Sequence, residues 1–392
     1  MDAVAPPPRR KWSWRSRAAR GLLYQAIALL VIALVIWFLA HNTQENLRVR
    51  GIRSGFDFLG AAAGFDIGES LIAFGPADSY ARAIWVGVLN TLRVALLGIL
   101  FTTVVGVLIG IGRFSRNALV RAFCYGYVEL VRNVPLLLQL LMWYVLFVEV
   151  LPPPQAAWNL AGLLYLSKGG LVFPVPVWGA GQIGMLVGAL AGLAVGWAWR
   201  RSAKRRFALT GEDRDRVWVP VLAVLAFAFV GGFTGAGPGE WRVPEQLAFA
   251  VDGGASMTPE FLALLLGLVL YTAAFVAEVV RSGTQSVDRG QVEAARALGL
   301  SARQQMRLVV LPQALRVIVP PLTNQYLNLT KNSSLAVAIG YPDVVSIANT
   351  TLNQTGRAVE CIAIIMAVYL TTSLATSAFM NWYNRRVAIK ER

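Results

Sequence analysis

The sequence is poor in the residues that most enzymes use for chemistry. It contains one histidine and two cysteines in 392 residues, and only 15% of the chain is charged, against about a quarter in soluble domains. One histidine, His41, cannot build a Ser-His-Asp, Cys-His or zinc site. The cysteines, Cys124 and Cys361, form neither a disulfide framework nor a CxxC site. No G-x-x-x-x-G-K-[ST] sequence occurs, so any ATP used has to bind to another chain. Catalysis, metal binding and cofactor binding by this chain are not expected.

Apolar residues dominate instead. Hydrophobic residues make up 56% of the chain and the mean hydropathy is +0.56. Runs that could cross a bilayer as helices lie at 21–40, 83–111, 122–151, 177–199, 217–234, 259–281, 317–340 and 358–381. We therefore predict an all-α polytopic membrane protein with about eight transmembrane helices. A signal peptide is the alternative for 21–40, but the run is too long and no A-x-A sequence follows it.

Basic residues are divided unequally between the loops. With the N-terminus inside, the inside segments hold 26 Lys and Arg and the outside segments hold 6. Cytoplasmic loops carry such an excess of positive charge. We therefore expect both termini, and the segment 282–316, in the cytoplasm.

The run 177–199 carries a glycine at every fourth position. Repeated small residues at this spacing let another helix approach closely, so we predict a packing face formed by Gly184, Gly188, Gly192 and Gly196. A glycine-rich helix without such a role is the alternative.

The most polar helix-patterned segment in the second half of the chain is Glu293 to Pro312. Asp288 is a suitable N-cap for a first short helix, with Gln291 completing a capping box, and Gly299 suits the left-handed position after it. Ser301 and Gln304 repeat the pattern for a second short helix that Pro312 ends or bends. A compact helix–turn–helix between two apolar runs is the prediction.

Ionisable residues inside apolar runs are functional candidates, because they are costly to bury unless paired. Glu129 and Arg132 are three residues apart and can pair on one helix face. Pro135 would bend or start a helix just after them. The pair is either part of a solute path or a self-neutralising structural pair. Glu278 and Lys331 are further such residues.

A polar stripe crosses the run 317–340. Asn324, Asn328 and Lys331 have i, i+4, i+7 spacing, and Ser333 and Ser334 extend the stripe. Such a stripe has to face protein or water rather than lipid. Amides with one ammonium suit a zwitterionic solute, whose carboxylate Lys331 could attract. Interhelical hydrogen bonding is the alternative.

The helix–turn–helix resembles a known signature. Glu293-Ala294-Ala295, Gly299 and Leu311-Pro312 fit the EAA loop of ABC importer permeases, EAA-x3-G-x9-I-x-LP, with Val309 in place of Ile. The segments 83–151 and 259–385 resemble the polar amino-acid (histidine/glutamine-type) permease family. Relative to the five-helix type I core of that family, the chain has additions that resemble the larger permease of general L-amino-acid importers (AapQ/BztB type).

The resemblance implies a division of the chain. The expected parts are a basic cytoplasmic tail 1–20, an extra helix 21–40, a periplasmic or interfacial loop 41–82, a first core part 83–151, an insertion 152–258 with two helices, a second core part 259–381 containing the EAA loop 282–316, and a tail 382–392. For 41–82 a loop folded on itself is the alternative to a segment on the membrane boundary.

The resemblance also implies a function. The chain is expected to be a permease subunit in a Gram-negative inner membrane, importing L-amino acids by alternating access. The implied partners are a second homologous permease, a periplasmic binding protein and an ATPase dimer that holds the ATP and Mg²⁺. Glu293, Ala294, Ala295 and Gly299 would contact the ATPase, with Arg289 and Arg296 as polar anchors. An ion-coupled secondary transporter and a membrane scaffold without transport are the alternatives.

Overall fold

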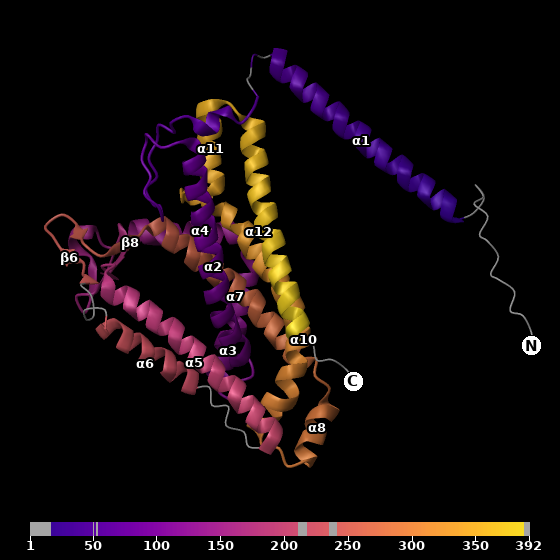
Figure 1. The fold of residues 1–392 in the computed structure, drawn as a ribbon, viewed down its shortest axis with the longest axis vertical. Helices are drawn as coiled ribbons and strands as arrows, with labels where there is room; N and C mark the ends of the chain where they lie inside the picture. The colour runs from indigo at the N-terminus through magenta and orange to yellow at the C-terminus, as the bar shows by residue number, and fades with distance from the viewer. Residues whose placement is uncertain (1–16, 50, 52–53, 211–217, 235–240, 388–392) are drawn as a thin grey trace, which may run out of the picture.

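The computed structural model describes residues 17–49, 51, 54–210, 218–234 and 241–387. Its first helix, α1 (Arg17–Val49), stands apart from the rest of the chain in Figure 1. None of its most apolar window is buried by other parts of the chain. This is the extra N-terminal helix predicted at 21–40; most of the predicted basic tail lies outside the described residues.

Residues 54–79 form a loop that folds back onto the helices. Phe58 and Ile67 are buried against α2 (Tyr80–Gly112) and α11 (Val344–Thr355). Asp57 pairs with Arg357 at 2.9 Å, just before α12 (Ala358–Val387). The loop therefore packs on the helical core rather than folding only on itself.

The centre of the molecule is the pair of α2 and α7 (Pro259–Gln285), which lie against each other in the helical bundle of Figure 1. Thr258 caps α7 by accepting a hydrogen bond from the backbone N–H of Phe261. The helices touch at Gly106 and Gly110, where Val276 and Val280 take the room that side chains would need. Glycine at these positions allows the close approach.

The apolar run predicted as one helix at 122–151 is two helices. α3 (Ala118–Asn133) and α4 (Leu136–Val145) meet at an angle of 104°, and a π-helical turn follows at Leu146–Val150. Pro135 is the N-cap of α4. A proline cannot continue a helix and disfavours helical backbone in the residue before it, so the prediction that Pro135 bends or starts a helix is confirmed.

The insertion contains a helical hairpin and short strands. Gly188, Gly192 and Gly196 of α5 (Ala180–Thr210) lie against the backbone of α6 (Trp218–Thr234). A Cβ on Gly188 would stand 2.0 Å from the carbonyl oxygen of Phe227. The strands are β1 (Trp158–Leu160), β2 (Leu164–Ser167), β3 (Gly170–Phe173), β4 (Val175–Pro176), β5 (Trp241–Arg242), β6 (Glu245–Gln246), β7 (Val251–Asp252) and β8 (Ala255–Met257).

These strands are a small addition to the all-α fold. The largest described sheet has the order β1-β2-β3-β8, and β4-β5 and β6-β7 are separate antiparallel pairs. β3 and β8 come from opposite sides of the α5–α6 hairpin. The sheet therefore closes the base of the hairpin.

The second half of the chain continues with α8 (Arg289–Ala297), a short turn of helix α9 (Ala302–Gln304) and α10 (Leu311–Asn332). A 3-10 turn at Ser333–Ile339 leads to α11. α10 packs against α7 and α12, and α11 packs against α2 and α12.

The number of spans differs from the prediction. Among the described residues, six helices are long and apolar enough to cross a membrane, or seven if α3 and α4 form one bent span. The shortfall from eight is α6, a shorter apolar helix. The all-α polytopic fold class is confirmed.

Candidate functional site

The polar helix–turn–helix, residues 288–312, begins with a capped helix. The backbone N–H of Gly290 donates to Asp288 Oδ1 at 2.9 Å, and the N–H of Gln291 donates to the Asp288 carbonyl at 3.1 Å. Asp288 is thus the N-cap that the sequence indicates. Its side chain bonds to the second residue of the helix, so Gln291 does not complete a capping box.

Gly299 ends α8 in the left-handed conformation, with φ of +75°. The N–H of Leu300 donates to the carbonyl of Ala295 at 3.2 Å, and that of Gly299 donates to Arg296 at 2.9 Å. These two bonds form a Schellman motif, which favours glycine at the left-handed residue. The turn direction therefore depends on Gly299.

Ser301 begins the second helical segment with a complete capping box. Its hydroxyl accepts from the N–H of Gln304 at 3.4 Å, and its own N–H donates to Gln304 Oε1 at 2.9 Å. The segment does not end at Pro312. A π-helical turn at Gln305–Val310 joins it to α10, with Pro312 in the first turn of α10. The prediction of a separate second short helix was wrong.

The helix–turn–helix projects most of its predicted contact residues into solvent. Exposed side chains are Arg289, Glu293, Ala294, Arg296, Ala297 and Leu311. Ala295 is buried, with 3% exposure, so it packs inward rather than facing a partner. Leu298, at the turn, is 79% exposed. The sequence analysis missed Leu298, although a leucine directly before the turn glycine of a polar helix was a usable signal.

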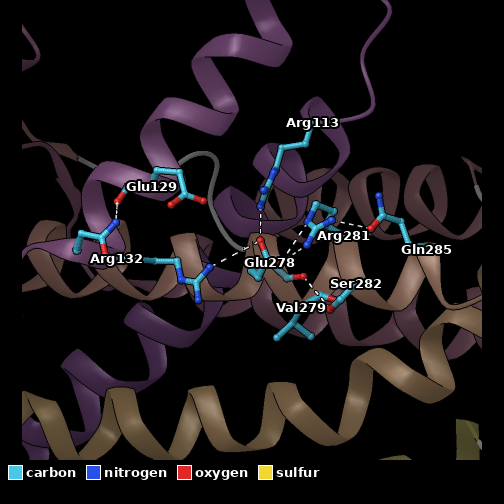
Figure 2. Close-up of polar contacts among 9 residues, drawn as sticks. Arg113, Glu129, Arg132, Glu278, Val279, Arg281, Ser282 and Gln285 are labelled. Atoms are coloured by element: carbon cyan, nitrogen blue, oxygen red, sulfur yellow. Dashed lines mark hydrogen bonds and ion pairs between the residues drawn. The ribbon is translucent and has the colours of Figure 1, made fainter.

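Near the end of α7 that leads to the helix–turn–helix, three arginines surround one glutamate, as Figure 2 shows. Arg113 Nη1 of the α2 C-cap lies 2.5 Å from Glu278 Oε2, and Arg132 Nη1 of α3 lies 3.7 Å from the same oxygen. Arg281 bonds the other oxygen, with its Nε at 3.1 Å. Glu278, Arg113, Arg132 and Arg281 are called the Glu278 cluster below.

The cluster corrects one prediction. In the described chain Arg132 pairs with Glu278 across helices instead of with Glu129 on its own helix. The side-chain amide of Asn133 donates to the Glu129 carbonyl at 2.6 Å. Glu129 and Arg132 thus belong near the end of α7 that leads to α8, whereas the polar stripe lies on α10. Sequence spacing could not find Arg113, which is 165 residues from its partner.

The stripe predicted on the seventh run lies on one face of α10. Asn324, Asn328 and Lys331 are exposed, while Tyr326 and Leu329 on the other face are buried. Among the described residues, no hydrogen bond or ion pair engages the three stripe side chains. Ser333 and Ser334, in the 3-10 turn that follows, instead donate to carbonyls at the end of α10, those of Thr330 at 2.7 Å and Lys331 at 2.8 Å. The polar stripe therefore consists of Asn324, Asn328 and Lys331, and does not include the two serines.

Within the described residues, no group of three or more His, Cys, Asp or Glu side chains could hold a metal ion. The site consists of an exposed helix–turn–helix, a charged cluster joining three helices and a polar stripe on an apolar helix. Such an arrangement can transmit movement and contact a polar solute.

Comparison with known proteins decides between transport and the alternatives. A family model described as "Binding-protein-dependent transport system inner membrane component" matches residues 102–389. The chain belongs to this family. It is a multi-pass membrane permease of an ABC importer, and so a transport component rather than an enzyme. ABC importers work with an ATPase and a binding protein, and the family description names the latter.

Relatives match over nearly the whole length. The general L-amino acid transport system permease protein AapQ of Rhizobium johnstonii is 44% identical, over 100% of this chain and 99% of its own. The putative amino-acid ABC transporter permease protein YhdX of Escherichia coli is 45% identical, over 97% of each chain. The glutamate/glutamine/aspartate/asparagine transport system permease protein BztB of Rhodobacter capsulatus is 40% identical, over 95% of each. The family resemblance found in the sequence is confirmed.

Proposed function

We propose that this protein is the permease subunit of an ATP-driven importer of L-amino acids. The observation that carries the proposal is its full-length identity to permeases whose names state amino-acid transport. The additions to the core, α1 and the 152–258 insertion, are included in that match. An importer of general specificity is the form favoured by the AapQ relative.

The proposed orientation puts both termini and residues 288–312 in the cytoplasm of a Gram-negative cell, with the chain in the inner membrane. The excess of Lys and Arg in the corresponding loops supports this. The exposed side chains of Glu293, Ala294 and Arg296 would then enter a groove of the ATPase, with Leu298 at the tip. ATP and Mg²⁺ would be bound by that partner.

The proposed solute path includes the α10 stripe. Polar groups exposed on a membrane helix have to be covered by protein or water, and the packed face of α10 leaves Asn324, Asn328 and Lys331 uncovered. A second, homologous permease facing this stripe would complete a polar path. The Lys331 ammonium would attract a substrate carboxylate, and the amides would orient the remaining polar groups.

The test is reconstitution of the chain with its neighbouring permease, ATPase and binding protein in proteoliposomes. Uptake of radiolabelled L-amino acids should require ATP, the ATPase and the binding protein together. Uptake driven by a proton or sodium gradient without the ATPase would support the ion-coupled alternative. ATP hydrolysis stimulated by the binding protein without any amino-acid uptake would overturn the substrate assignment.

A further inference from the structure

The Glu278 cluster occupies a place that the proposed function does not explain. Glu278 lies seven residues before the end of α7 at Gln285, and α8 begins at Arg289. Arg281 Nη1 donates to Gln285 Oε1 at 2.6 Å, so polar contacts continue along the last two turns of α7. Val287, between the helices, packs against the core cluster that includes Val280. The connection from Glu278 to α8 is therefore short and packed.

On its other side, Glu278 contacts two different helices. Arg113 caps the end of α2, and its side chain is 3% exposed. Its guanidinium lies over the ring of Tyr125 of α3, 4.1 Å from the centroid. Arg132 of α3 reaches both Glu278 and the ring of Phe275, 5.2 Å from its centroid. One carboxylate thus joins the ends of α2 and α3 to α7.

Glu278 is the shared partner of three guanidinium groups. The buried Nε of Arg113 has no hydrogen-bond partner in the described chain. Arg281 lies on α7 itself, whereas Arg113 comes from the end of α2 and Arg132 from α3. These two arginines make Glu278 a common attachment point, whose loss frees both α2 and α3.

We propose that Glu278 is the positioning residue that transmits movement of the helix–turn–helix at 288–312 to α2 and α3 during transport. This rests on the proposed function, in which that segment docks on an ATPase. A displacement at Gln285, the end of α7, would shift Glu278 seven residues earlier in the same helix. The contacts of Glu278 with Arg113 and Arg132 would then displace α2 and α3, and α3 leads through Pro135 into α4.

The first test removes one contact while leaving the buried pair intact. In Arg132→Gln, Glu278 keeps Arg113 and Arg281, so the complex should assemble in normal amount. The amino acid imported per ATP hydrolysed should fall about fivefold or more, the scale of measured coupling effects. Arg121→Gln is the matched control, because Arg121 is an exposed arginine of the same helix whose guanidinium donates to the Ser115 carbonyl at 3.1 Å, away from Glu278. An unchanged ratio in Arg132→Gln would overturn the proposal.

The second test separates coupling from stability. Glu278→Gln alone leaves Arg113 buried without a counter-charge and should lower the amount of assembled complex. Glu278→Gln with Arg113→Gln removes both charges and should restore that amount. If Glu278 only stabilises the fold, the double variant also regains the wild-type amount of amino acid imported per ATP hydrolysed, and the proposal is wrong. If Glu278 transmits movement, the double variant assembles but hydrolyses ATP with little import.

A third variant covers the case in which the double variant does not assemble. Glu278→Asp keeps the charge on a shorter side chain, so the complex should assemble. The amino acid that it imports per ATP hydrolysed should lie between the values of wild type and Arg132→Gln. A wild-type value would contradict a role that depends on a side chain long enough to contact both arginines. If instead the proposed function is wrong, the wild-type complex itself imports no L-amino acid, so the two failures are distinguishable.

Discussion

Gly106 of α2 lies so close to Val276 of α7 that a Cβ on the glycine would stand 2.6 Å from the valine Cβ. It would also stand 3.0 Å from the carbonyl oxygen of Ala273. Neither atom is at the free end of a side chain, so neither can move aside without shifting a helix. The two central helices can therefore approach only with glycine at this position.

Replacing Gly106 by alanine should lower stability by about 1–3 kcal/mol, the usual cost of overpacking a close contact. The measurement is the midpoint of thermal unfolding in detergent. Gly126→Ala on α3 is the matched control, because no heavy atom lies within 4 Å of its Cβ position, and alanine there should be neutral or stabilising. Equal midpoints for Gly106→Ala and wild type would show that α2 and α7 are not in this contact.

Replacing Gly299 by valine should uncouple ATP hydrolysis from import. Valine is strained at φ of +75°, so the Schellman turn would open and α8 would change direction relative to α9. ATPase stimulation by the loaded binding protein and uptake should both fall, with the chain still present in the membrane. Gly290→Ala, in the first turn of α8, is the control. Stimulation that survives unchanged in Gly299→Val would refute a coupling role for this loop.

How far the sequence predicts the structure depends on the range of the interaction. Asp288, Gly299 and Ser301 act on residues a few positions away, and the helix start, turn and second start were predictable from them. The continuation of the helix through Pro312 was not predictable, because it depends on a π-helical turn before the proline, which no local propensity indicates.

Longer-range contacts were predicted poorly. The spacing of Glu129 and Arg132 suggested a pair on one helix, but Glu278 of α7 presents an oxygen to Arg132. The break between α3 and α4 occurs at Pro135. The sequence predicts a bend or a helix start there, but not the angle of 104°. The stripe on α10 was predictable because it depends only on helical periodicity.

Replacing Lys331 by methionine should reduce uptake by about tenfold or more, since in the proposed path the charge-assisted contact of its ammonium with a substrate carboxylate is worth more than about 1.4 kcal/mol. Methionine is an unbranched side chain one atom shorter than lysine, and it removes the charge. Assembly with the ATPase should be unaffected, because Lys331 is far along the chain from residues 288–312. Lys168→Met, in the turn between β2 and β3, is the control. Unchanged uptake in Lys331→Met would favour a scaffold without a solute path at the stripe.

The burial of Asp343 predicts that the stability of the fold depends on pH. It lies between the apolar stretches Ala302–Ile339 and Ala358–Arg385, and is 1% exposed. Its Oδ1 accepts from the N–H of Ser346 at 2.8 Å, and its Oδ2 accepts from the hydroxyl of Tyr369 at 3.4 Å. Burial raises the pKa of Asp343 from 3.8 to about 7, against the smaller opposing effect of these hydrogen bonds.

Because the raised pKa means that the folded state binds this proton more tightly than the unfolded state, protonation of Asp343 stabilises the fold. This stabilisation is fully present below about pH 4 and is lost as the pH rises through about 7. In Asp343→Asn the amide oxygen can still cap α11, but no proton is released. Between about pH 5 and about pH 8 the unfolding midpoint of wild type should therefore fall relative to that of Asp343→Asn. Asp252→Asn, which neutralises an exposed carboxylate of β7, should keep the wild-type slope. If wild type and Asp343→Asn show parallel pH profiles, Asp343 is not the group that titrates.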